Sequence, residues 1–504
     1  MSDKMKPASF EYLFDKACRE YENTGTIFQV PVKENKYDIP IGPAAGPHTQ
    51  LAQNIVSAYA AGAVYFELKT VQMLYGDDLG IKKPCIYVGS EVYNTEWSSE
   101  LSAHDAGNEY IKAFLLIKAL RKAFILPDHG MHFIASVGYD LDGIKSPQID
   151  CFIDYMKDAS TSDEWQGDVE YLRKTGMFTD EDMNEICSDT CIADTVTLST
   201  MHGCPADEIE KIASYLLEEK GLNTVVKMNP TLIGRKKTAD ILKKKGYDSL
   251  HYSDDAFENS ITPDDAVSMV KRCQDKALSL GLRFSVKMTN TFPVFSEGIM
   301  KDEMMYMSGP ALFPLSIAAA ALIAERLDGN VEISYSGGAD EKNIAQILLT
   351  GIKPVTVSSI LLKPGGYSNI GRLLEAVKQS EYEEKTHIDT ERLEELAEAS
   401  VEDENYDRKE RHIYKRQPNY KNDCAVCHNC VDVCPNRANV RIEDDGGKPH
   451  VIHIDNYCNG CGCCSFNCLM GHDPYLEKLT ISDDDTVSWE LQKLIKKGTE
   501  EGVL

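Results

Sequence analysis

The sequence predicts an α/β protein in which a (β/α)8 TIM barrel is followed by a small α+β domain rich in cysteine. Short apolar runs alternate with helix-like stretches from residue 37 to 378, the pattern of parallel strands joined by helices. Eight such runs can be counted, which favours a closed barrel over an open doubly wound sheet. Nine of the 16 cysteines then fall between Cys424 and Cys468.

The first segment, 1–36, has an amphipathic helical pattern with Phe10, Leu13, Phe14 and Ala17 on one face. The barrel, 37–378, follows it. We expect its strands at 38–46, 63–68, 132–137, 194–199, 223–228, 283–288, 331–336 and 354–359.

Polar, helix-like stretches at 151–190 and 235–265 show no strand pattern. We therefore expect two insertions in the barrel, the first of them after its third strand. Residues 379–420 are strongly acidic and are expected to form a helix and a linker. The cysteine-rich domain occupies 421–480, and 481–504 is expected to be a charged tail.

The cysteine-rich domain repeats one motif, Cys-x2-Cys-x2-Cys-x3-Cys, from Cys424 to Cys434 and from Cys458 to Cys468. Bacterial two-cluster ferredoxins have this spacing: three thiolates of one motif bind a [4Fe–4S] cluster and the other motif supplies the fourth ligand. We expect one cluster on Cys424, Cys427, Cys430 and Cys468, and a second on Cys458, Cys461, Cys464 and Cys434. Zinc is the alternative, but the doubled spacing argues against it. Cys463 is expected to be a bystander.

Composition excludes several functions. The net charge of −27 disfavours nucleic-acid binding, which needs a basic surface. The sequence contains neither a long apolar stretch nor the apolar region of a signal peptide. We therefore expect a cytoplasmic protein without a membrane span.

Two strand ends suggest a phosphate site. The seventh strand ends at Gly337 and Gly338, and the eighth at Ser358 and Ser359. In barrels, phosphate binds on the loops that follow these two strands. Loops favour glycine in any case, so each pair alone is weak evidence.

Nine segments carry a more specific signal: IGPAAGPHT, FELKTV, YNTEW, ASVGYD, HGCP, VKMNP, MTNT, SGPALFPL and SGGAD occur in this order. The order resembles the dihydroorotate dehydrogenase family of FMN barrels. It resembles still more the flavin half of dihydropyrimidine dehydrogenase, in which a two-cluster ferredoxin domain also follows the barrel. The closest resemblance, over about residues 8–475, is to bacterial selenate reductase subunits, a branch of that group.

This resemblance implies FMN as the cofactor. The positions that match its contacts are Ala45, Gly46, Lys69, Thr70, Ser136 and Lys227. We expect Gly309 and the phosphate-site residues Gly337, Gly338, Ser358 and Ser359 to bind FMN as well. A cation at Lys227 would stabilise negative charge on the reduced flavin. Lys287 lies in a similar segment, VKMTN, and is a rival for that role.

The resemblance also implies a substrate site and a proton donor. Asn94, Asn229, Asn290 and Thr291 match an amide-rich cradle that holds a cyclic imide through donors and acceptors. Cys204 matches the cysteine that acts as general acid or base opposite the flavin. The family's Asn-x-Ser-Cys-Pro is Met-His-Gly-Cys-Pro here, so His202 is either a second proton donor or a packing residue.

The leading hypothesis is a flavin-dependent oxidoreductase subunit that acts on a C=C or C=N bond of a pyrimidine- or purine-like N-heterocycle. The family name points to selenate, but oxyanion reduction usually needs a different metal centre. Because no G-x-G-x-x-G follows a strand, the electron partner is expected to be a separate FAD- and NAD(P)H-binding subunit or a ferredoxin. The alternative is an electron-transfer or scaffold subunit whose barrel performs no chemistry. The oligomeric state is left open.

Overall fold

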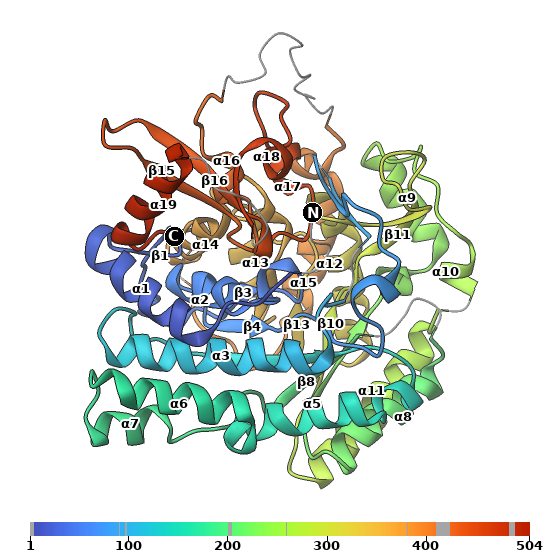
Figure 1. The fold of residues 1–504 in the computed structure, drawn as a ribbon. Coiled ribbons are helices and arrows are strands. Elements are labelled where there is room, and N and C mark those ends of the chain that lie inside the picture. The colour runs from blue at the N-terminus through green and yellow to red at the C-terminus, as the bar shows by residue number, and fades with distance from the viewer. Residues whose placement is uncertain are drawn as a thin grey trace.

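The computed structural model describes residues 5–89, 91–95, 98–199, 204–258, 260–380, 382–409, 424–482 and 489–504. Within these residues, eight parallel strands form a closed barrel at the centre of the molecule (Figure 1). The strands are β3 (Ile41–Pro43), β4 (Tyr65–Glu67), β7 (His132–Val137), β8 (Thr195–Ser199), β9 (Asn223–Met228), β10 (Phe284–Met288), β13 (Ile333–Tyr335) and β14 (Val355–Val357). Each lies within one of the expected runs, and the predicted (β/α)8 barrel is confirmed.

The ring closes between β3 and β4, beside a glycine. The backbone N–H of Val64 donates to the carbonyl of Ile41 at 3.0 Å. A Cβ on Gly42 would lie 1.6 Å from the carbonyl oxygen of Tyr65. Any side chain at position 42 would therefore push the two strands apart.

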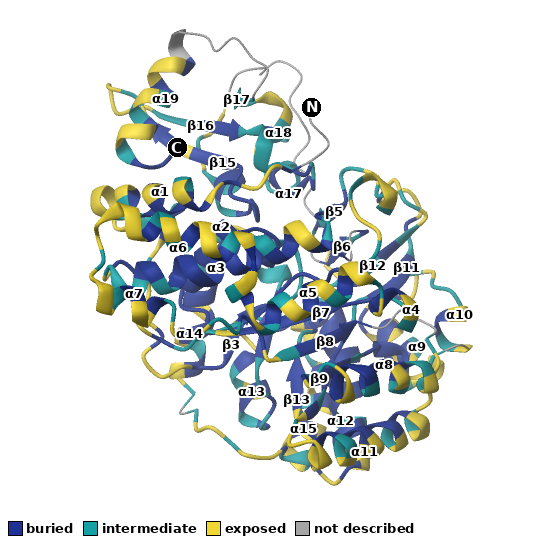
Figure 2. Cartoon of the chain, turned by 60° about the horizontal axis from the view of Figure 1, so that its bottom comes forward, coloured by how far each residue is buried: buried dark blue, intermediate teal, exposed yellow. Residues whose placement is uncertain are grey.

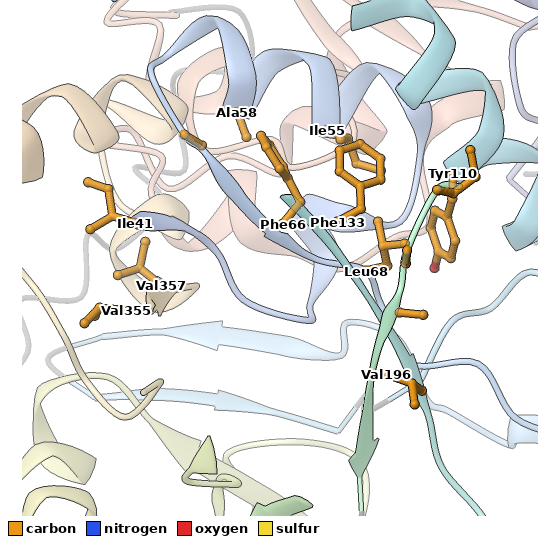
Figure 3. Packing of buried hydrophobic residues seen from close by; sticks show 14 of the residues in the cluster. Ile41, Ile55, Ala58, Phe66, Leu68, Tyr110, Phe133, Val196, Val355 and Val357 are labelled. Carbon is orange, nitrogen blue, oxygen red and sulfur yellow. The ribbon is translucent and has the colours of Figure 1, made fainter. Parts of the chain in front are cut away.

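The barrel strands are apolar on the outside and partly charged on the inside. Phe66 and Leu68, in and just after β4, lie in one buried cluster with Ile55 of α2 (Ala52–Ala60) (Figure 3). Successive side chains of a strand point to opposite faces. Glu67 therefore points into the barrel, where it meets lysines of β9 and β10.

Helices cover the barrel, with their inner faces buried and their outer faces exposed (Figure 2). The covering helices are α2, α3 (Ala103–Lys122), α8 (Ala206–Glu218), α11 (Pro263–Ser279), α12 (Phe313–Arg326), α13 (Ile344–Leu349) and α14 (Asn369–Lys378). Further helices lie in, or just before, the stretches where insertions and an acidic helix were expected. They are α4 (Leu141–Ile144), α5 (Pro147–Lys157), α6 (Asp163–Thr175), α7 (Asp180–Ile186), α9 (Arg235–Lys244), α10 (Asp255–Glu258) and α15 (Thr390–Glu402). α5 and α6 pack on α3, and α15 packs on α12.

The N-terminal helix α1 (Phe10–Thr24) buries Phe10, Leu13, Phe14 and Ala17, the face that the sequence indicated. The hydroxyl of its N-cap, Ser9, accepts the N–H of Tyr12, and the helix ends at the left-handed Gly25. A short hairpin of β1 (Thr26–Ile27) and β2 (Val30–Pro31) follows.

A small antiparallel sheet lies beside the carboxyl end of the barrel and was not foreseen from the sequence. It joins β5 (Ile86–Val88) and β6 (Val92–Asn94), which follow β4, to β11 (Phe292–Phe295) and β12 (Met304–Ser308), which follow β10. This sheet supplies one wall of the cavity described below.

The C-terminal module, residues 424–482 and 489–504, contains a sheet of β15 (Asn439–Glu443), β16 (Pro449–Ile454) and β17 (Leu479–Ile481). Its helices are α16 (Asn429–Asp432), α17 (Cys463–Phe466), α18 (Pro474–Glu477) and α19 (Trp489–Glu501). The expected charged tail, 481–504, thus contains α19, whose Leu491 and Leu494 are buried against Ile442 and Ile452. Apolar residues at helical spacing anchor this segment between its charges.

The module rests on the N-terminal segment (Figure 1). The side chain of Arg437 donates to the carbonyl of Phe28 at 2.9 Å, and that of Gln29 donates to the carbonyl of Arg441 at 2.9 Å. In the part of the chain that the structure describes, no helix is long and apolar enough to span a bilayer.

Candidate functional site

A cavity of about 520 Å³ opens at the carboxyl end of the barrel, between the strand ends and the small antiparallel sheet. It brings together most of the residues that the sequence singled out. Those lining it are Ala45, Gly46, Thr70, Asn94, Lys227, Asn290, Thr291, Gly309, Gly337, Gly338, Ser358 and Ser359. Active sites of barrels occupy this end, so the cavity is the candidate active site.

One end of the cavity is built from closely packed glycines. A Cβ on Gly338 would lie 2.3 Å from the carbonyl oxygen of Gly309, and one on Gly337 would lie 2.4 Å from the hydroxyl of Ser316. The hydroxyl of Ser359 donates to that of Ser308 at 3.3 Å. Backbone and hydroxyl groups that line a cavity in this way suit a phosphate.

The structure separates the two rival lysines. Lys227 lines the cavity, and burial lowers the pKa of its ammonium group to about 8, with Glu67 opposing the shift and Lys287 adding to it. Lys287 is fully buried outside the cavity wall, with its Nζ 2.8 Å from Glu67 Oε1. Of the two lysines, Lys227 is therefore the one that can contact a ligand in the cavity.

Three hydroxyl groups meet where β4, β7 and β8 end. The Oγ1 of Thr70 lies 2.8 Å from the Oγ of Ser136 and 3.4 Å from the Oγ of Ser199. Thr70 and Ser199 line the cavity, whereas Ser136 is fully buried behind them. Ser136 therefore supports the wall of the cavity.

The predicted amide cradle is assembled in part. Asn94, Asn290 and Thr291 line the cavity. Asn229 is buried behind Asn290 and accepts a hydrogen bond from its Nδ2 at 2.8 Å. This bond orients the amide of Asn290.

Cys204 lies in the loop between β8 and α8, and is not part of the cavity wall formed by the described residues. Burial raises the pKa of its thiol to about 11, with Glu208 and Asp207 adding to the shift. The thiol therefore keeps its proton at neutral pH. His202 lies outside the described residues.

Several wall residues were missed from the sequence. They are Ser199, Thr289, Tyr306, Ser308, Ser336, Asp340, Thr356 and Lys363. Small polar residues at strand ends, such as Ser199 and Ser336, carry a signal that could have found them. Tyr306 could not be found in this way because its strand, β12, was itself unexpected.

The cysteines of the module gather in the two predicted sets. Cys434, Cys458, Cys461 and Cys464 line one small cavity together with Cys463. In the other set, the pKa of Cys430 is raised to about 12, chiefly by burial, and Cys424, Cys427 and Cys468 lie close enough to contribute to this shift. In the described residues, no three His, Cys, Asp or Glu side chains are arranged to hold a single metal ion.

The two cysteine motifs have matching backbones. The residues two places after Cys424 and Cys458, Val426 and Gly460, each have positive φ, and each donates an N–H to that cysteine's sulfur, at 3.4 Å and 3.3 Å. His428 has positive φ as well, as does its counterpart in the second motif.

The similarity continues after the last cysteine of each motif. Cys434 and Cys468 each accept an N–H from the residue four places on, Ala438 and His472, at 3.2 Å and 3.3 Å. Backbone amides directed at sulfur stabilise negative charge there.

The second cysteine motif touches the barrel beside the cavity. The N–H of Ile86 in β5 donates to the carbonyl of Cys461 at 2.9 Å. Glu100 accepts from Asn459 at 2.9 Å and pairs with Lys83 at 2.6 Å. Burial lowers the pKa of Lys69 to about 8, with Glu100, Cys85 and Cys461 raising it in part. Lys69 does not line the cavity and lies on the side that faces the module.

A family model described as the oxidoreductase YgfK, N-terminal TIM-barrel domain, matches residues 15–408. The barrel and its added helices lie inside this match, and the C-terminal module lies outside it.

Two curated relatives are YgfK oxidoreductases, from Escherichia coli strain K12 and from Escherichia coli O157:H7. Each is 41% identical over 427 residues, which cover 79% of this chain and 41% of the relative. The chain thus spans about two fifths of their length. A solved structure, that of DHODH in complex with ferulenol from Eimeria tenella, is 15% identical and has a TM-score of 0.42. The match covers 74% of this chain and 91% of that chain.

Proposed function

Because the chain belongs to the family of the YgfK oxidoreductase N-terminal TIM-barrel domain, we propose that it is an FMN- and iron–sulfur-dependent oxidoreductase subunit. It reduces or oxidises a C=C or C=N bond of a pyrimidine- or purine-like N-heterocycle. The observation that carries the proposal is the 520 Å³ cavity, which gathers glycines, a lysine and amides at the carboxyl end of the barrel. That end is where barrel enzymes do their chemistry.

The donor groups of the cavity fit FMN. Gly337 and Gly338 leave backbone accessible, and Ser358 and Ser359 add hydroxyls, so this end suits the phosphate. Lys227 suits the ring end, since a cation there favours the negative charge of reduced flavin. When bound, FMN supplies hydride transfer to or from the substrate.

Amides and a thiol would serve the substrate. Asn94 and Asn290 offer donors and acceptors to an N–H and C=O edge, and the bond from Asn290 to Asn229 fixes one of the two amides. Cys204 would exchange the proton, since its raised pKa keeps the thiol protonated until the substrate accepts that proton.

Eight cysteines of the module fit two [4Fe–4S] clusters. A cube takes one thiolate at each iron, so it does not need three ligands on one metal ion. Cys424 and Cys458 accept equivalent N–H···S bonds, and so do Cys434 and Cys468. This likeness supports the same cluster-binding role for both motifs. When present, the clusters supply one-electron transfer to or from the barrel.

A second candidate is an electron-transfer or scaffold subunit without chemistry in the barrel. It is favoured by the position of Cys204 outside the cavity wall of the described residues. The glycine-rich end and Lys227 favour the first candidate, because a barrel without a cofactor has no need of them.

Anaerobic reconstitution separates the two candidates. The protein is reconstituted with FMN, iron and sulfide, and its flavin spectrum is recorded. The photoreduced protein is then mixed with uracil, xanthine or urate, and the oxidised protein is mixed with dihydropyrimidines. The first candidate predicts bound FMN that one of the former compounds reoxidises or one of the latter reduces. Absence of bound FMN would favour the scaffold.

Cys204→Ala tests the proton step. We expect turnover to fall by two orders of magnitude or more, since general acid catalysis contributes about 10²–10⁴-fold. Cys151→Ala, at an exposed thiol, is the matched control and should turn over normally. Normal turnover of Cys204→Ala would remove the proposed role.

We also propose that the electron partner is a separate FAD- and NAD(P)H-binding subunit or a ferredoxin, and that the protein is cytoplasmic. All 16 cysteines lie in the described residues and none forms a disulfide, which suits a reducing compartment. Affinity purification from the native host should recover the partner. Full NAD(P)H-dependent activity of the chain alone would contradict this.

A further inference from the structure

Three charged side chains form a group inside the barrel, beneath the cavity. Glu67, Lys227 and Lys287, the interior triad, come from β4, β9 and β10. Glu67 and Lys287 are 2% and 0% exposed. Burying charges is costly unless they are paired, so this arrangement needs a reason.

Glu67 is held from several sides. Its Oε1 lies 2.8 Å from Lys287 Nζ, and its Oε2 accepts from Thr356 and from the backbone N–H of Ala45, each at 3.2 Å. Lys287 also donates to Thr356 at 2.8 Å. Since Ala45 and Thr356 line the cavity, Glu67 sits directly under its floor.

The carboxylate of Glu67 also acts on Lys227. Burial favours the neutral form of Glu67, but Lys287 and Lys227 together lower its pKa below the usual value. Glu67 in turn opposes the effect of burial on the pKa of Lys227, while Lys287 adds to it. Two ammonium groups and one carboxylate give the interior triad a net charge of +1.

We infer that Glu67, held in place by its ion pair with Lys287, is a positioning residue that keeps Lys227 protonated beside the bound flavin. It thereby sets the pH range over which flavin reduction draws in an extra proton. This inference rests on the proposed flavin site. It concerns residues of three different strands that no local motif connects.

The proton balance gives the expected signature. Two electrons and one proton convert oxidised flavin to its anionic reduced form, and the new negative charge favours protonated Lys227. Below pH of about 8, the pKa of Lys227, this lysine is charged before and after reduction. Above it, Lys227 Nζ binds a second proton when the two electrons arrive, so the flavin midpoint potential should fall more steeply with pH.

Variants at Glu67 and Lys287 should move the pH at which this slope changes, and should move it in opposite directions. Glu67→Gln removes the charge that raises the pKa of Lys227, so the steep region should begin about one pH unit lower or more. Lys287→Met removes the charge that lowers this pKa, so the steep region should begin higher. The double variant should return toward the wild type.

The measurement is a spectroelectrochemical titration of bound FMN between pH 6 and 10, on the full chain, with dithionite as reductant. Lys227→Met should abolish the change of slope. The control is Glu384→Gln, at the exposed Lys353–Glu384 pair, which should leave it unchanged. Opposite shifts distinguish charge from general loosening of the fold, which would move both single variants alike.

Two outcomes would overturn separate claims. If wild-type protein binds no FMN, the proposed function fails. If FMN binds and the onset of the steep region is the same in Glu67→Gln, Lys287→Met and wild type, the function stands and the inference fails. Should Glu67→Gln not fold, Lys287→Met alone still gives a signed result.

Discussion

At the scale of single residues, Gly338 should be the glycine on which the cavity depends most. Its φ is +80°, and a Cβ would lie 2.3 Å from the carbonyl oxygen of Gly309. Gly338→Ala must therefore move the loops that form the glycine-rich end of the cavity. We expect FMN affinity to fall at least about tenfold, or about 1.4 kcal/mol, measured by fluorescence titration of the reconstituted protein.

Gly298 supplies the control. Its φ is +88°, but a Cβ there would meet nothing within 4 Å. Gly298→Ala should cost about 1–2 kcal/mol of stability through backbone strain alone and leave FMN affinity unchanged. If both variants bound FMN equally well, the crowding at Gly338 would have no part in binding.

Cys204 should react slowly with alkylating agents until the pH is high. Burial raises the pKa of its thiol from 9.0 to about 11, and the thiolate is the reactive form. At pH 8, its rate with iodoacetamide should be about 100-fold below that of a thiol with the ordinary pKa, and it should rise tenfold per pH unit up to pH of about 11.

Peptide mapping by mass spectrometry measures this rate, with exposed Cys151 in the same sample as the reference. A fast reaction of Cys204 at pH 8 would show that its thiol is not held protonated. It would then be unsuited to act as the acid.

Local sequence does not distinguish the roles of Lys227 and Lys287. Both lie in a Val-Lys-Met segment at the end of a barrel strand, and their neighbours give no reason to prefer one. Their roles diverge because Glu67, on a strand distant in the sequence, pairs with Lys287. Such a partner becomes visible only when the barrel has closed.

At the scale of elements, the junction of β3 and β4 should be the least tolerant part of the barrel. A Cβ on Gly42 would lie 1.6 Å from the carbonyl oxygen of Tyr65, a contact that only separation of the strands can relieve. We expect Gly42→Ala to destabilise the protein by about 4 kcal/mol or more, the range of severe core disruptions, or to prevent folding. Thermal and urea denaturation measure the change.

Gly167 in the exposed part of α6 is the matched control, since nothing lies within 4 Å of a Cβ built there. Gly167→Ala should stabilise the helix by up to about 1 kcal/mol, because alanine is the better helix former. Loss of stability in both variants would contradict the special role of the strand junction.

The elements that the sequence predicted belong to a repeating pattern, and the elements that it missed do not. The barrel strands are short apolar runs bounded by helices, a pattern that repeats eight times and so reinforces itself. β5 and β11 belong to loops and have no such repeat. Each pairs with the next strand in the sequence, β6 or β12. The two hairpins are joined only by the pairing of β12 with β6, which are far apart in the sequence. The cavity wall at Asn94 and Tyr306 therefore depends on contacts that periodicity does not reveal.

At the scale of the whole molecule, spacing predicts a barrel followed by a cysteine-rich domain, but not how the two parts meet. The contact uses the chain's first residues: the N–H of Lys6 donates to the carbonyl of Asn456 at 2.8 Å, and Arg437 reaches Phe28. None of these residues is a cysteine of the two motifs. The arrangement puts the second cysteine motif next to the barrel, where the carbonyl of Cys461 accepts a hydrogen bond from the backbone of β5.

The crossed assignment of cysteines gives a test of this architecture. Cys434 belongs to the first motif, yet it lines one cavity with Cys458, Cys461 and Cys464 of the second. Cys434→Ser should therefore remove the same cluster as Cys458→Ser, and a different one from Cys424→Ser. Iron should fall from about eight to about four atoms per chain, as expected for loss of one of two [4Fe–4S] clusters.

Metal analysis and low-temperature EPR of the dithionite-reduced protein measure the two quantities. Cys463→Ser is the matched control: Cys463 lies in the same cavity but has no counterpart among the four cysteines of the first motif, so its loss should leave both clusters. If the EPR spectrum of Cys434→Ser instead matched that of Cys424→Ser, each motif would hold its own cluster. The cluster beside the barrel would then be bound by the four cysteines of the second motif alone. Electrons would still pass from that cluster to the cavity by way of Cys461.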